Sequence, residues 1–246
     1  MRIPLIDGLL RRLGAGGSQT TDLQKWEAKH RQTIAADLKP IWQHLAEDLI
    51  FVDVGANIGL FSEAILEGRP KAKGFLFEPV KDMHSRCAAR FGSDPRITLE
   101  NFALGQESGQ ATIFKARYNP GGNSLVEELM FDKRDVSEVV ENPDHESEEI
   151  QIEVFDDYAK SKGLDFVHFI KTDTEGFDYR VLQGMMGFLN ACEPKPLILS
   201  ELMSEEYHPF WADQAKVLQQ LYDMGYGKVD MSNMEKVQDF LFVHKG

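Results

Sequence analysis

The sequence predicts an α/β fold in which a mostly parallel sheet is covered by helices. Three observations support this prediction. Short apolar runs alternate with helical patterns of about ten residues, as expected of βαβ units. The first run ends in a glycine turn that leads into a helix, and acidic residues follow several of the runs directly. The length of 246 residues suits one such domain with additions.

The glycine turn belongs to Phe51–Gly59, which reads FVDVGANIG. The run is nearly free of polar residues, as expected for a central parallel strand that is buried on both faces. Gly55 and Gly59 remove the Cβ atom where backbone segments or a ligand approach closely. Asn57 is of the non-glycine type that best tolerates left-handed backbone geometry. A strand, a tight turn and a helix that begins near Ile58 predict a nucleotide site at the carboxyl end of the sheet.

The spacing of this turn argues against a dinucleotide. The dinucleotide motif is G-x-G-x-x-G with an acidic residue about 20 positions onward. This chain has Asp53-x-Gly55-x-Asn57-x-Gly59 instead, with Glu78 after the next apolar run, and it has no P-loop motif. A carboxylate here repels a pyrophosphate and suits a ligand that carries an ammonium and a sulfonium, such as S-adenosylmethionine. Glu78 can accept hydrogen bonds from both ribose hydroxyls. The alternative is an ordinary α/β turn in which Asp53 caps backbone amides.

Composition and charge exclude several classes of protein. A net charge of −13 argues against a nucleic-acid partner, which requires a concentrated basic face. Cys87 and Cys192 lie in unrelated segments and indicate neither a disulfide framework nor a zinc cluster. No apolar run approaches the roughly 18 residues of a membrane-spanning helix. We therefore expect a cytoplasmic protein.

The sequence predicts a helical extension over residues 1–48 and the main domain over residues 49–246. Arg2–Leu13 has the pattern of a short amphipathic helix that docks on the domain, on a second subunit or on a membrane surface. Gly14–Thr20 is a flexible linker by composition. A helical region then extends to about Ala46, and Pro40 is expected to break it. Its apolar stripe consists of Leu23, Trp26, His30, Ile34, Leu38, Ile41, Trp42 and Leu45.

The first half of the main domain continues the alternation of strands and helices. The predicted elements are a helix from Ile58 to about Glu67, a strand Gly74–Glu78, a helix Val80–Phe91 and a strand Ile97–Asn101.

The alternation then breaks. Phe102–Gly105 is predicted to be a turn, and Ala111–Lys115 is strand-like. Asn119–Asn123 is a strong loop signal. Residues 117–149 form an acidic insertion, for which a solvated flap is the ordinary explanation. Its place beside the expected site leaves a role in covering the substrate as a hypothesis.

Strands and helices return after the insertion. The predicted elements are a strand Ile150–Phe155, a helix Asp156–Lys162, a buried strand Phe166–Thr172, a helix Phe177–Leu189, a strand Pro196–Ser200, a helix Trp211–Met224, and closing strands Tyr226–Val229 and Phe240–His244.

Four motifs of the chain are characteristic in combination. They are FVDVGANIG, FEP at Phe77–Pro79, ENFALG at Glu100–Gly105 and FIKTDTEGFDYRVLQG at Phe169–Gly184. Together they resemble the FkbM family of S-adenosylmethionine-dependent methyltransferases, over roughly Leu49–Leu202. The resemblance implies a Rossmann-like class I methyltransferase fold, a seven-stranded, mostly parallel sheet with helices on both faces and an antiparallel last strand. It also implies O-methylation of a hydroxyl on a sugar or a secondary metabolite.

The resemblance assigns residues to the cofactor. Asp53, Gly55, Ala56, Asn57 and Ile58 are expected at its methionine and ribose end, Glu78 at the ribose with Pro79 shaping the turn behind it, and Asn101, Phe102 and Ala103 at the adenine. Asn123 and Ser124 match a small polar position of the family. For Phe102 a place in the core is an equal alternative. The residues that determine which substrate is bound are expected in the N-terminal helices and the acidic insertion.

Asp173 and Glu175 are the candidate catalytic residues. They follow a central strand, and a carboxylate can take the proton of an acceptor hydroxyl. Asp173 is alternatively a contact of the cofactor amine. Lys171 shares the strand face of Asp173, so a buried ion pair explains it equally well. His208 is a second candidate base, in a loop where it can also be incidental.

Glu201 adds a third carboxylate at the end of the next strand. Three acidic groups can bind Mg²⁺ or Ca²⁺, whereas a helix-capping role for Glu201 is simpler. The expected function is therefore methyl transfer from S-adenosylmethionine to a small-molecule acceptor, with metal dependence open. The alternatives are an NAD(P)-dependent or nucleotide-sugar oxidoreductase on a similar sheet and a non-catalytic cofactor-binding scaffold. A homo-oligomer is also left open.

Overall fold

A computed structural model describes residues 22–116, 121–129, 146–230 and 237–246. The predictions for Arg2–Leu13, for Gly14–Thr20 and for residues 130–145 of the acidic insertion lie outside the described residues. Within the described ranges, no helix combines the length and the apolar character needed to cross a membrane.

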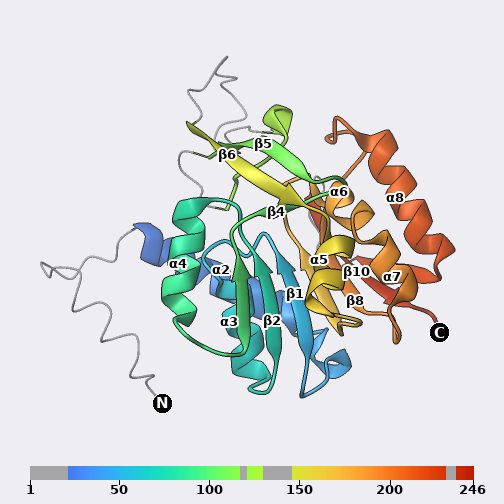
Figure 1. The fold of residues 1–246 in the computed structure, drawn as a ribbon, viewed down its shortest axis with the longest axis horizontal. Coiled ribbons are helices and arrows are strands. Elements are labelled where there is room, and N and C mark those ends of the chain that lie inside the picture. The colour runs from blue at the N-terminus through green and yellow to red at the C-terminus, as the bar shows by residue number, and fades with distance from the viewer. Residues whose placement is uncertain (1–21, 117–120, 130–145, 231–236) are drawn as a thin grey trace, which may run out of the picture.

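A seven-stranded sheet forms the centre of the molecule, in the order β3-β2-β1-β7-β8-β10-β9 (Figure 1). Its strands from β3 to β8 in this order are parallel, and β10 is antiparallel to both neighbours. This confirms the predicted α/β fold and its antiparallel last strand. The strands are β1 (Ile50–Val54), β2 (Lys73–Phe77), β3 (Ile97–Glu100), β7 (Phe169–Thr172), β8 (Leu197–Met203), β9 (Tyr226–Asp230) and β10 (Val237–His244).

Two hydrophobic cores cover the two faces of the sheet. Phe51 points into one core and its neighbour Val52 into the other, because successive strand side chains alternate in direction. Both side chains are fully buried. The buried apolar run of β1 therefore reflects a strand covered on both sides, as its sequence predicts.

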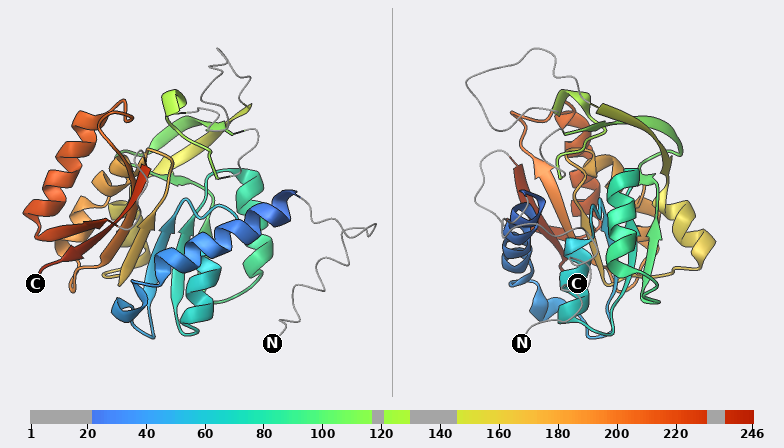
Figure 2. Two further views of the ribbon diagram at one scale, coloured as in Figure 1. Left: turned by 180° about the vertical axis from the view of Figure 1, so that it is seen from behind. Right: turned by 90° about the vertical axis from the view of Figure 1, so that its left-hand side faces the viewer.

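The helices divide between these two cores (Figure 2). α2 (Asp22–Leu38), α3 (Leu60–Gly68) and α4 (Lys81–Phe91) contribute to the core that contains Phe51. α5 (Phe155–Lys162), α6 (Asp178–Gln183), α7 (Met186–Ala191) and α8 (Trp211–Asp223) contribute to the core that contains Val52. The break expected at Pro40 occurs, since α2 ends at Leu38 and a short 3₁₀ helix, η1 (Trp42–His44), follows.

The helix predicted over Phe177–Leu189 is two helices. α6 ends at Gln183 and α7 begins at Met186. A Cβ atom on Gly184 would lie 2.0 Å from the carbonyl oxygen of Gly105, so the two backbones touch at this point. The Gly184 carbonyl also accepts a hydrogen bond from the Asp156 amide instead of continuing a helix. The break arises from contacts that are distant in sequence.

A second, three-stranded sheet lies above the carboxyl ends of the main strands (Figure 1). It has the order β4 (Ala103–Leu104), β6 (Glu146–Glu153) and β5 (Gly109–Lys115), and η2 (Glu127–Leu129) follows β5. The turn predicted over Phe102–Gly105 is wrong, because β4 pairs with β6. β6 also begins inside the predicted acidic insertion, since pairing with β5 satisfies its backbone. Glu146, Glu149 and Glu153 stay exposed, and Glu148 forms ion pairs with Lys81 and Lys115.

Candidate active site

A cavity of about 300 Å³ lies at the carboxyl ends of β1, β2, β7 and β8. Ten of the predicted catalytic and cofactor residues line it. Lys171 lies in β7 itself, and the other nine come from the three turns after β1, β2 and β7 and from the start of β4. The ten are Gly55, Ala56, Asn57, Ile58, Glu78, Pro79, Ala103, Lys171, Asp173 and Glu175. The site is therefore assembled where the fold class predicts it.

The turn after β1 has left-handed backbone at Gly55, Asn57 and Gly59, with φ values of 74°, 52° and 83°. This confirms the conformation expected of Asn57, whose Oδ1 accepts a hydrogen bond of 2.7 Å from the Ile58 amide. A Cβ atom on Gly55 would lie 2.0 Å from the carbonyl oxygen of Asp173. Glycine is required here because the turns after β1 and β7 are in backbone contact.

Glu78 connects the turns after β1 and β2. Its Oε2 accepts a hydrogen bond of 2.7 Å from the Asn57 amide, and its Oε1 one of 2.9 Å from the Val80 amide. Burial raises the pKa of Glu78 to about 7, although both amides act to lower it. Each carboxylate oxygen retains a second lone pair, which a ribose hydroxyl can use.

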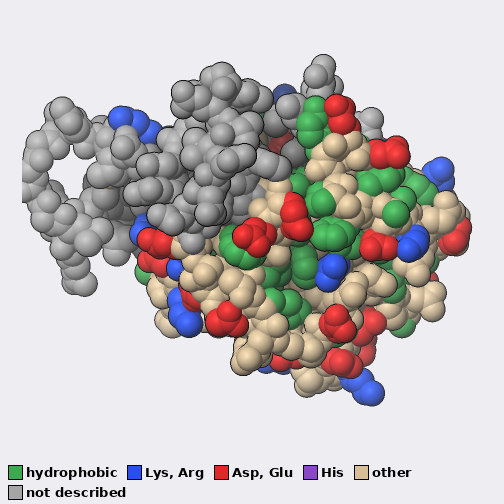
Figure 3. Space-filling model, turned by 90° about the horizontal axis from the view of Figure 1, so that it is seen from above, with side chains coloured by type: hydrophobic (Ala, Val, Ile, Leu, Met, Phe, Trp, Pro, Cys, Tyr) green, Lys and Arg blue, Asp and Glu red, His purple; other side chains and the backbone are tan. Residues whose placement is uncertain are grey.

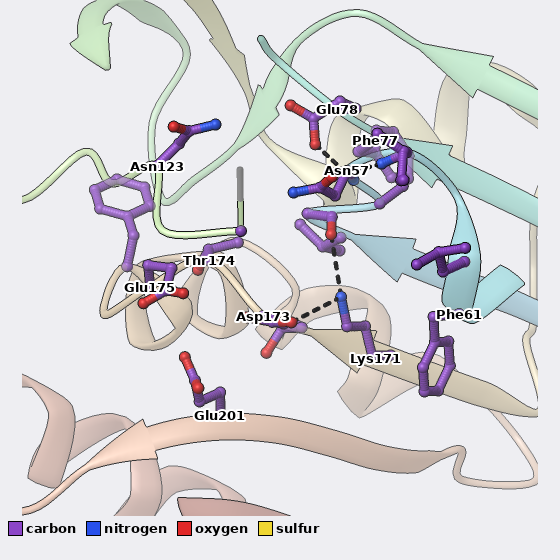
Figure 4. Close-up of a pocket in the computed structure, with 18 of the residues that line it drawn as sticks. Asn57, Phe61, Phe77, Glu78, Asn123, Lys171, Asp173, Thr174, Glu175 and Glu201 are labelled. Carbon is purple, nitrogen blue, oxygen red and sulfur yellow. Dashed lines mark hydrogen bonds and ion pairs between the residues drawn. The ribbon is translucent and has the colours of Figure 1, made fainter. Parts of the chain in front are cut away.

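Lys171 is the central cation of the site (Figure 4). Its Nζ lies 3.3 Å from Asp53 Oδ1 and 3.4 Å from Asp173 Oδ2, and it donates a hydrogen bond of 3.1 Å to the Gly55 carbonyl. Burial acts to lower the pKa of Lys171, but Asp173 and Asp53 outweigh burial and hold that pKa above its ordinary value. The buried ion pair considered from the sequence is confirmed. Lys171 stays protonated, so it cannot act as a general base.

Asp53 lies behind Lys171 and does not line the cavity. Its side chain is fully buried, and its Oδ2 accepts a hydrogen bond of 2.6 Å from Ser62 Oγ. The expectation that Asp53 lines the methionine end is therefore corrected: its carboxylate is used by Lys171 and Ser62 within the protein. Asp53 can act on a ligand only through Lys171.

The adenine contacts expected of Asn101 and Phe102 also need correction, because neither side chain lines the cavity. Asn101 Nδ2 donates hydrogen bonds of 2.9 and 3.0 Å to the carbonyl groups of Glu78 and Pro79. Phe102 packs against the rings of Phe77 and Tyr158. Phe102 is therefore a core residue, which was the alternative considered for it. Asn101 stabilises the turn that contains Glu78.

Two hydrogen bonds from other parts of the chain hold the turn after β7, which carries Asp173 and Glu175. The side chain of Asp173 is 45% exposed and opens into the cavity. Glu175 has a left-handed φ of 51°, and its carbonyl accepts a hydrogen bond of 2.7 Å from Ser124 Oγ. His208 Nε2 donates a hydrogen bond of 3.0 Å to the Gly176 carbonyl. The two candidate catalytic carboxylates thus stand on a turn that is fixed from outside.

The expectation that His208 is an exposed candidate base is wrong. His208 is 4% exposed, and its Nδ1 accepts a hydrogen bond of 2.9 Å from the Phe210 amide. Both ring nitrogens are therefore engaged with the backbone. Burial lowers the pKa of His208, although the Gly176 hydrogen bond acts to raise it. His208 does not line the cavity and instead supports the turn that carries Glu175.

Three further carboxylates line the cavity: Glu201 from β8, Asp239 from β10 and Asp37 from α2. Glu201 and Asp239 stand opposite each other in the antiparallel ladder. Burial, followed by the charge of Asp173, raises the pKa of all three carboxyl groups, that of Asp239 to about 7. Among the described lining residues, Lys171 is the only Lys or Arg against six Asp and Glu side chains. The cavity is strongly acidic.

Helix α2 forms one wall of the cavity, but none of its residues was among the predicted catalytic or cofactor residues. Trp26 and His30 stack with ring centroids 3.7 Å apart, and both line the cavity. They belong to the predicted apolar stripe of the N-terminal helical region, whose later members Leu38 and Ile41 are fully buried. His30 and Asp37 are polar residues on this otherwise apolar face, and they are the feature of the sequence that indicates a cavity wall.

Comparisons with known proteins identify the family of this chain. The family described as "Methyltransferase FkbM domain" matches residues 53–227. The 2-O-methyltransferase NoeI of Sinorhizobium fredii is 26% identical over 166 residues, which are 63% of this chain and 62% of NoeI. The AMB antimetabolite synthetase AmbE of Pseudomonas aeruginosa is 35% identical over 78 residues, which are 31% of this chain and 4% of AmbE. The chain thus spans less than two thirds of the length of both relatives.

Among solved structures, a putative O-methyltransferase from Klebsiella pneumoniae is similar in fold. It shares 12% sequence identity and a TM-score of 0.48, with 99% of this chain and 91% of that chain covered.

Proposed function

The chain belongs to the FkbM methyltransferase family, and on that premise we propose that it transfers a methyl group from S-adenosylmethionine to a hydroxyl oxygen. The acceptor is a small molecule, either a sugar or a secondary metabolite. The name of the relative NoeI, a 2-O-methyltransferase, supports oxygen as the accepting atom. Two free, buried cysteines fit a reducing compartment, and the proposal includes the cytoplasm as the location.

The acidic cavity is the observation that carries this proposal. S-adenosylmethionine brings a sulfonium and an ammonium, and both are attracted by the carboxylates of a half-buried site. A dinucleotide brings a pyrophosphate, which the same carboxylates repel. The cavity charge therefore favours methyl transfer over the NAD(P)-dependent alternative.

The turns suggest how the cofactor is held. Glu78 has acceptor capacity left for the ribose hydroxyls, and it sits between the turns after β1 and β2. The backbone of Gly55–Ile58 lines the cavity without a side chain at its first position, which leaves room for the methionine part. Ala103 and Leu104 of β4 line the adjoining wall and are the proposed neighbours of the adenine.

The chemistry then requires an oriented acceptor and a proton acceptor. The hydroxyl oxygen forms a bond to the methyl carbon, the carbon–sulfur bond breaks with its electrons going to sulfur, and the hydroxyl proton leaves. Glu175 is the proposed proton acceptor, and general bases of this kind contribute roughly 10²–10⁴-fold to the rate. Lys171 holds Asp173 in place by an ion pair of 3.4 Å. The remaining catalysis comes from positioning.

A methyl-transfer assay tests the proposal. Purified protein is incubated with S-adenosylmethionine and a panel of sugars and hydroxylated polyketides, and products are identified by the mass of one added methyl group. We expect a methyl ether on at least one acceptor, and Glu175→Gln to lower kcat about 10²-fold or more while cofactor affinity is kept. Glu206→Gln, a change of an exposed carboxylate outside the cavity, is the matched control. Methylation of amine acceptors alone would contradict O-methylation.

A further inference from the structure

We propose that Asp173, Glu175 and Glu201 bind a divalent cation of the Mg²⁺, Mn²⁺ or Ca²⁺ class. The three residues stand at the ends of the neighbouring strands β7 and β8, at the wall of the cavity. Binding of the cation follows from these side chains alone. Its use in methyl transfer rests on the function proposed above.

The geometry of the three carboxylates suits one cation. One oxygen atom from each residue lies within 4.8 Å of one oxygen atom from each of the others. Hard cations bind carboxylate oxygens at about 2.0–2.6 Å, so two ligands on opposite sides of an ion are about 4–5 Å apart. Figure 4 shows the carboxylate of Glu201 directed toward the side chains of Asp173 and Glu175. Small adjustments of side chains therefore suffice to close the site.

Glu201 supplies a second observation that points to a ligand. Its Oε2 atom is buried and has no hydrogen-bond partner among the described residues. An uncompensated buried carboxylate is costly, because it has lost its water without gaining a donor. The helix-capping role considered for Glu201 is not present, since neither α6 nor α8 has a side-chain cap.

The protein does not supply the missing positive charge to Glu201. Lys171 is bound to Asp53, Asp173 and the Gly55 carbonyl, and no ion pair of Glu201 occurs among the described residues. Asp239, directly across the strand ladder, adds a like charge instead. Like charges directly opposite in a sheet are destabilising. A bound cation supplies the positive charge that Glu201 lacks.

The cation would act at the acceptor side of the cavity. Three carboxylates leave coordination positions open, because Mg²⁺ and Ca²⁺ take six or more oxygen ligands. A hydroxyl oxygen of the acceptor can occupy such a position, and a metal-bound hydroxyl loses its proton more readily. The proposed acceptor class is accordingly a polyhydroxylated molecule that can offer oxygen ligands to the cation.

Titration with Mn²⁺, followed by the loss of its free-ion electron paramagnetic resonance signal, tests the site. The full chain is used after treatment with a chelator, and wild type is compared with Glu201→Gln, which keeps the shape of the side chain. We expect saturable binding by wild type and at least about a tenfold loss of affinity in Glu201→Gln. Glu206→Gln, on the exposed loop beyond β8, is expected to bind like wild type.

Two results would overturn the site: no saturable binding of Mn²⁺ by wild type, or equal affinity in Glu201→Gln. Either result shows that the carboxylate of Glu201 does not hold a cation. Calorimetry with S-adenosylmethionine on the same preparations separates this failure from failure of the proposed function. Cofactor binding without Mn²⁺ binding removes the metal site alone, and Mn²⁺ binding without cofactor binding removes the methyltransferase proposal alone.

Discussion

Lys171 joins more of the site than any other described residue. It neutralises the fully buried Asp53, orients Asp173 and binds the carbonyl of Gly55. Its removal would leave Asp53 as a buried charge without a counter-ion. Breaking a buried pair in this way is far more harmful than losing a surface ion pair.

Lys171→Met is therefore expected to lower the free energy of unfolding by about 3–5 kcal/mol. Urea-induced unfolding measures the change. Lys73→Met, an exposed lysine at the start of β2, is the control and should change the free energy by less than about 0.5 kcal/mol. Adding Asp53→Asn to Lys171→Met should restore part of the loss. A Lys171→Met protein as stable as wild type would refute the proposed role of the ion pair.

Gly55→Ala and Gly92→Ala form a matched pair of variants. Both glycines have positive φ, 74° and 61°, so alanine is strained at each by about 1 kcal/mol or more. Only Gly55 also faces a backbone atom, since no heavy atom lies within 4 Å of a Cβ on Gly92. We expect Gly55→Ala to lose cofactor binding and Gly92→Ala to keep it, as measured by calorimetry. Equal cofactor affinity in both would contradict the close contact of the two turns.

The sequence predicted those features of the site that depend on the residue itself and its neighbours in the chain. The left-handed Asn57 and the glycines of its turn follow from backbone preferences, and the Lys171 ion pair follows from strand periodicity. The sequence could not predict that Asp53 lies behind Lys171, or that His208 is buried against Gly176. Both facts depend on which face of an element meets a segment that is distant in sequence.

At the scale of elements, α2 has two functions along its length. Its final turn is buried against the sheet, with Leu38 fully covered. Its earlier turns present Trp26 and His30 to the cavity, and Asp37 of the final turn also lines it. The apolar stripe predicted the helix and its orientation toward the domain. It could not separate core from cavity, because an aromatic side chain suits both.

Because Trp26 of α2 lines the cavity, we expect it to contact the acceptor, and Trp26→Ala tests this expectation. Loss of a packing ring costs about 0.5–1.5 kcal/mol, so the KM for the acceptor should rise about two- to tenfold. The KM for S-adenosylmethionine should stay the same. Tyr222→Ala, an exposed aromatic on α8 that does not line the cavity, is the control. A rise in the KM for the cofactor alone would place Trp26 at the other ligand.

The alternation of strands and helices predicted most of the large sheet, because the strand and helix patterns of each βαβ unit are visible in its own stretch of sequence. In the small sheet it predicted strands that overlap β5 and β6, but it did not predict β4, which consists of Ala103 and Leu104. A two-residue strand exists only through its pairing with β6, which begins more than forty positions later. The gap in helix α6–α7 has the same origin, namely the contact of Gly184 with Gly105.

For the whole molecule, negative charge is the dominant electrostatic feature. The net charge is −13, and on the described surface in Figure 3 Lys and Arg side chains are scattered and do not gather into a patch. Six acidic side chains line the cavity, where burial raises the pKa of Glu78 and Asp239 to about 7. Burial also raises the pKa of Asp178, which lies outside the cavity lining, to about 6. These groups resist ionisation in the folded state.

The stability of the ligand-free protein should accordingly fall as the pH rises. Between about pH 4.5 and 7 the unfolded chain has lost these protons while the folded protein retains them, so ionisation favours unfolding. We expect the free energy of unfolding, measured with urea and a chelator present, to fall by at least about 1 kcal/mol from pH 5 to pH 7.5. Glu78→Gln should flatten this dependence. Stability that increases steadily over this range would contradict the raised pKa values.

Calorimetric titration with S-adenosylmethionine, its demethylated product S-adenosylhomocysteine, and NAD tests the central claim most directly. The acidic cavity predicts that both sulfur compounds bind in a saturable manner and that NAD does not. Binding of NAD with no binding of either sulfur compound, with or without an acceptor present, would contradict the account.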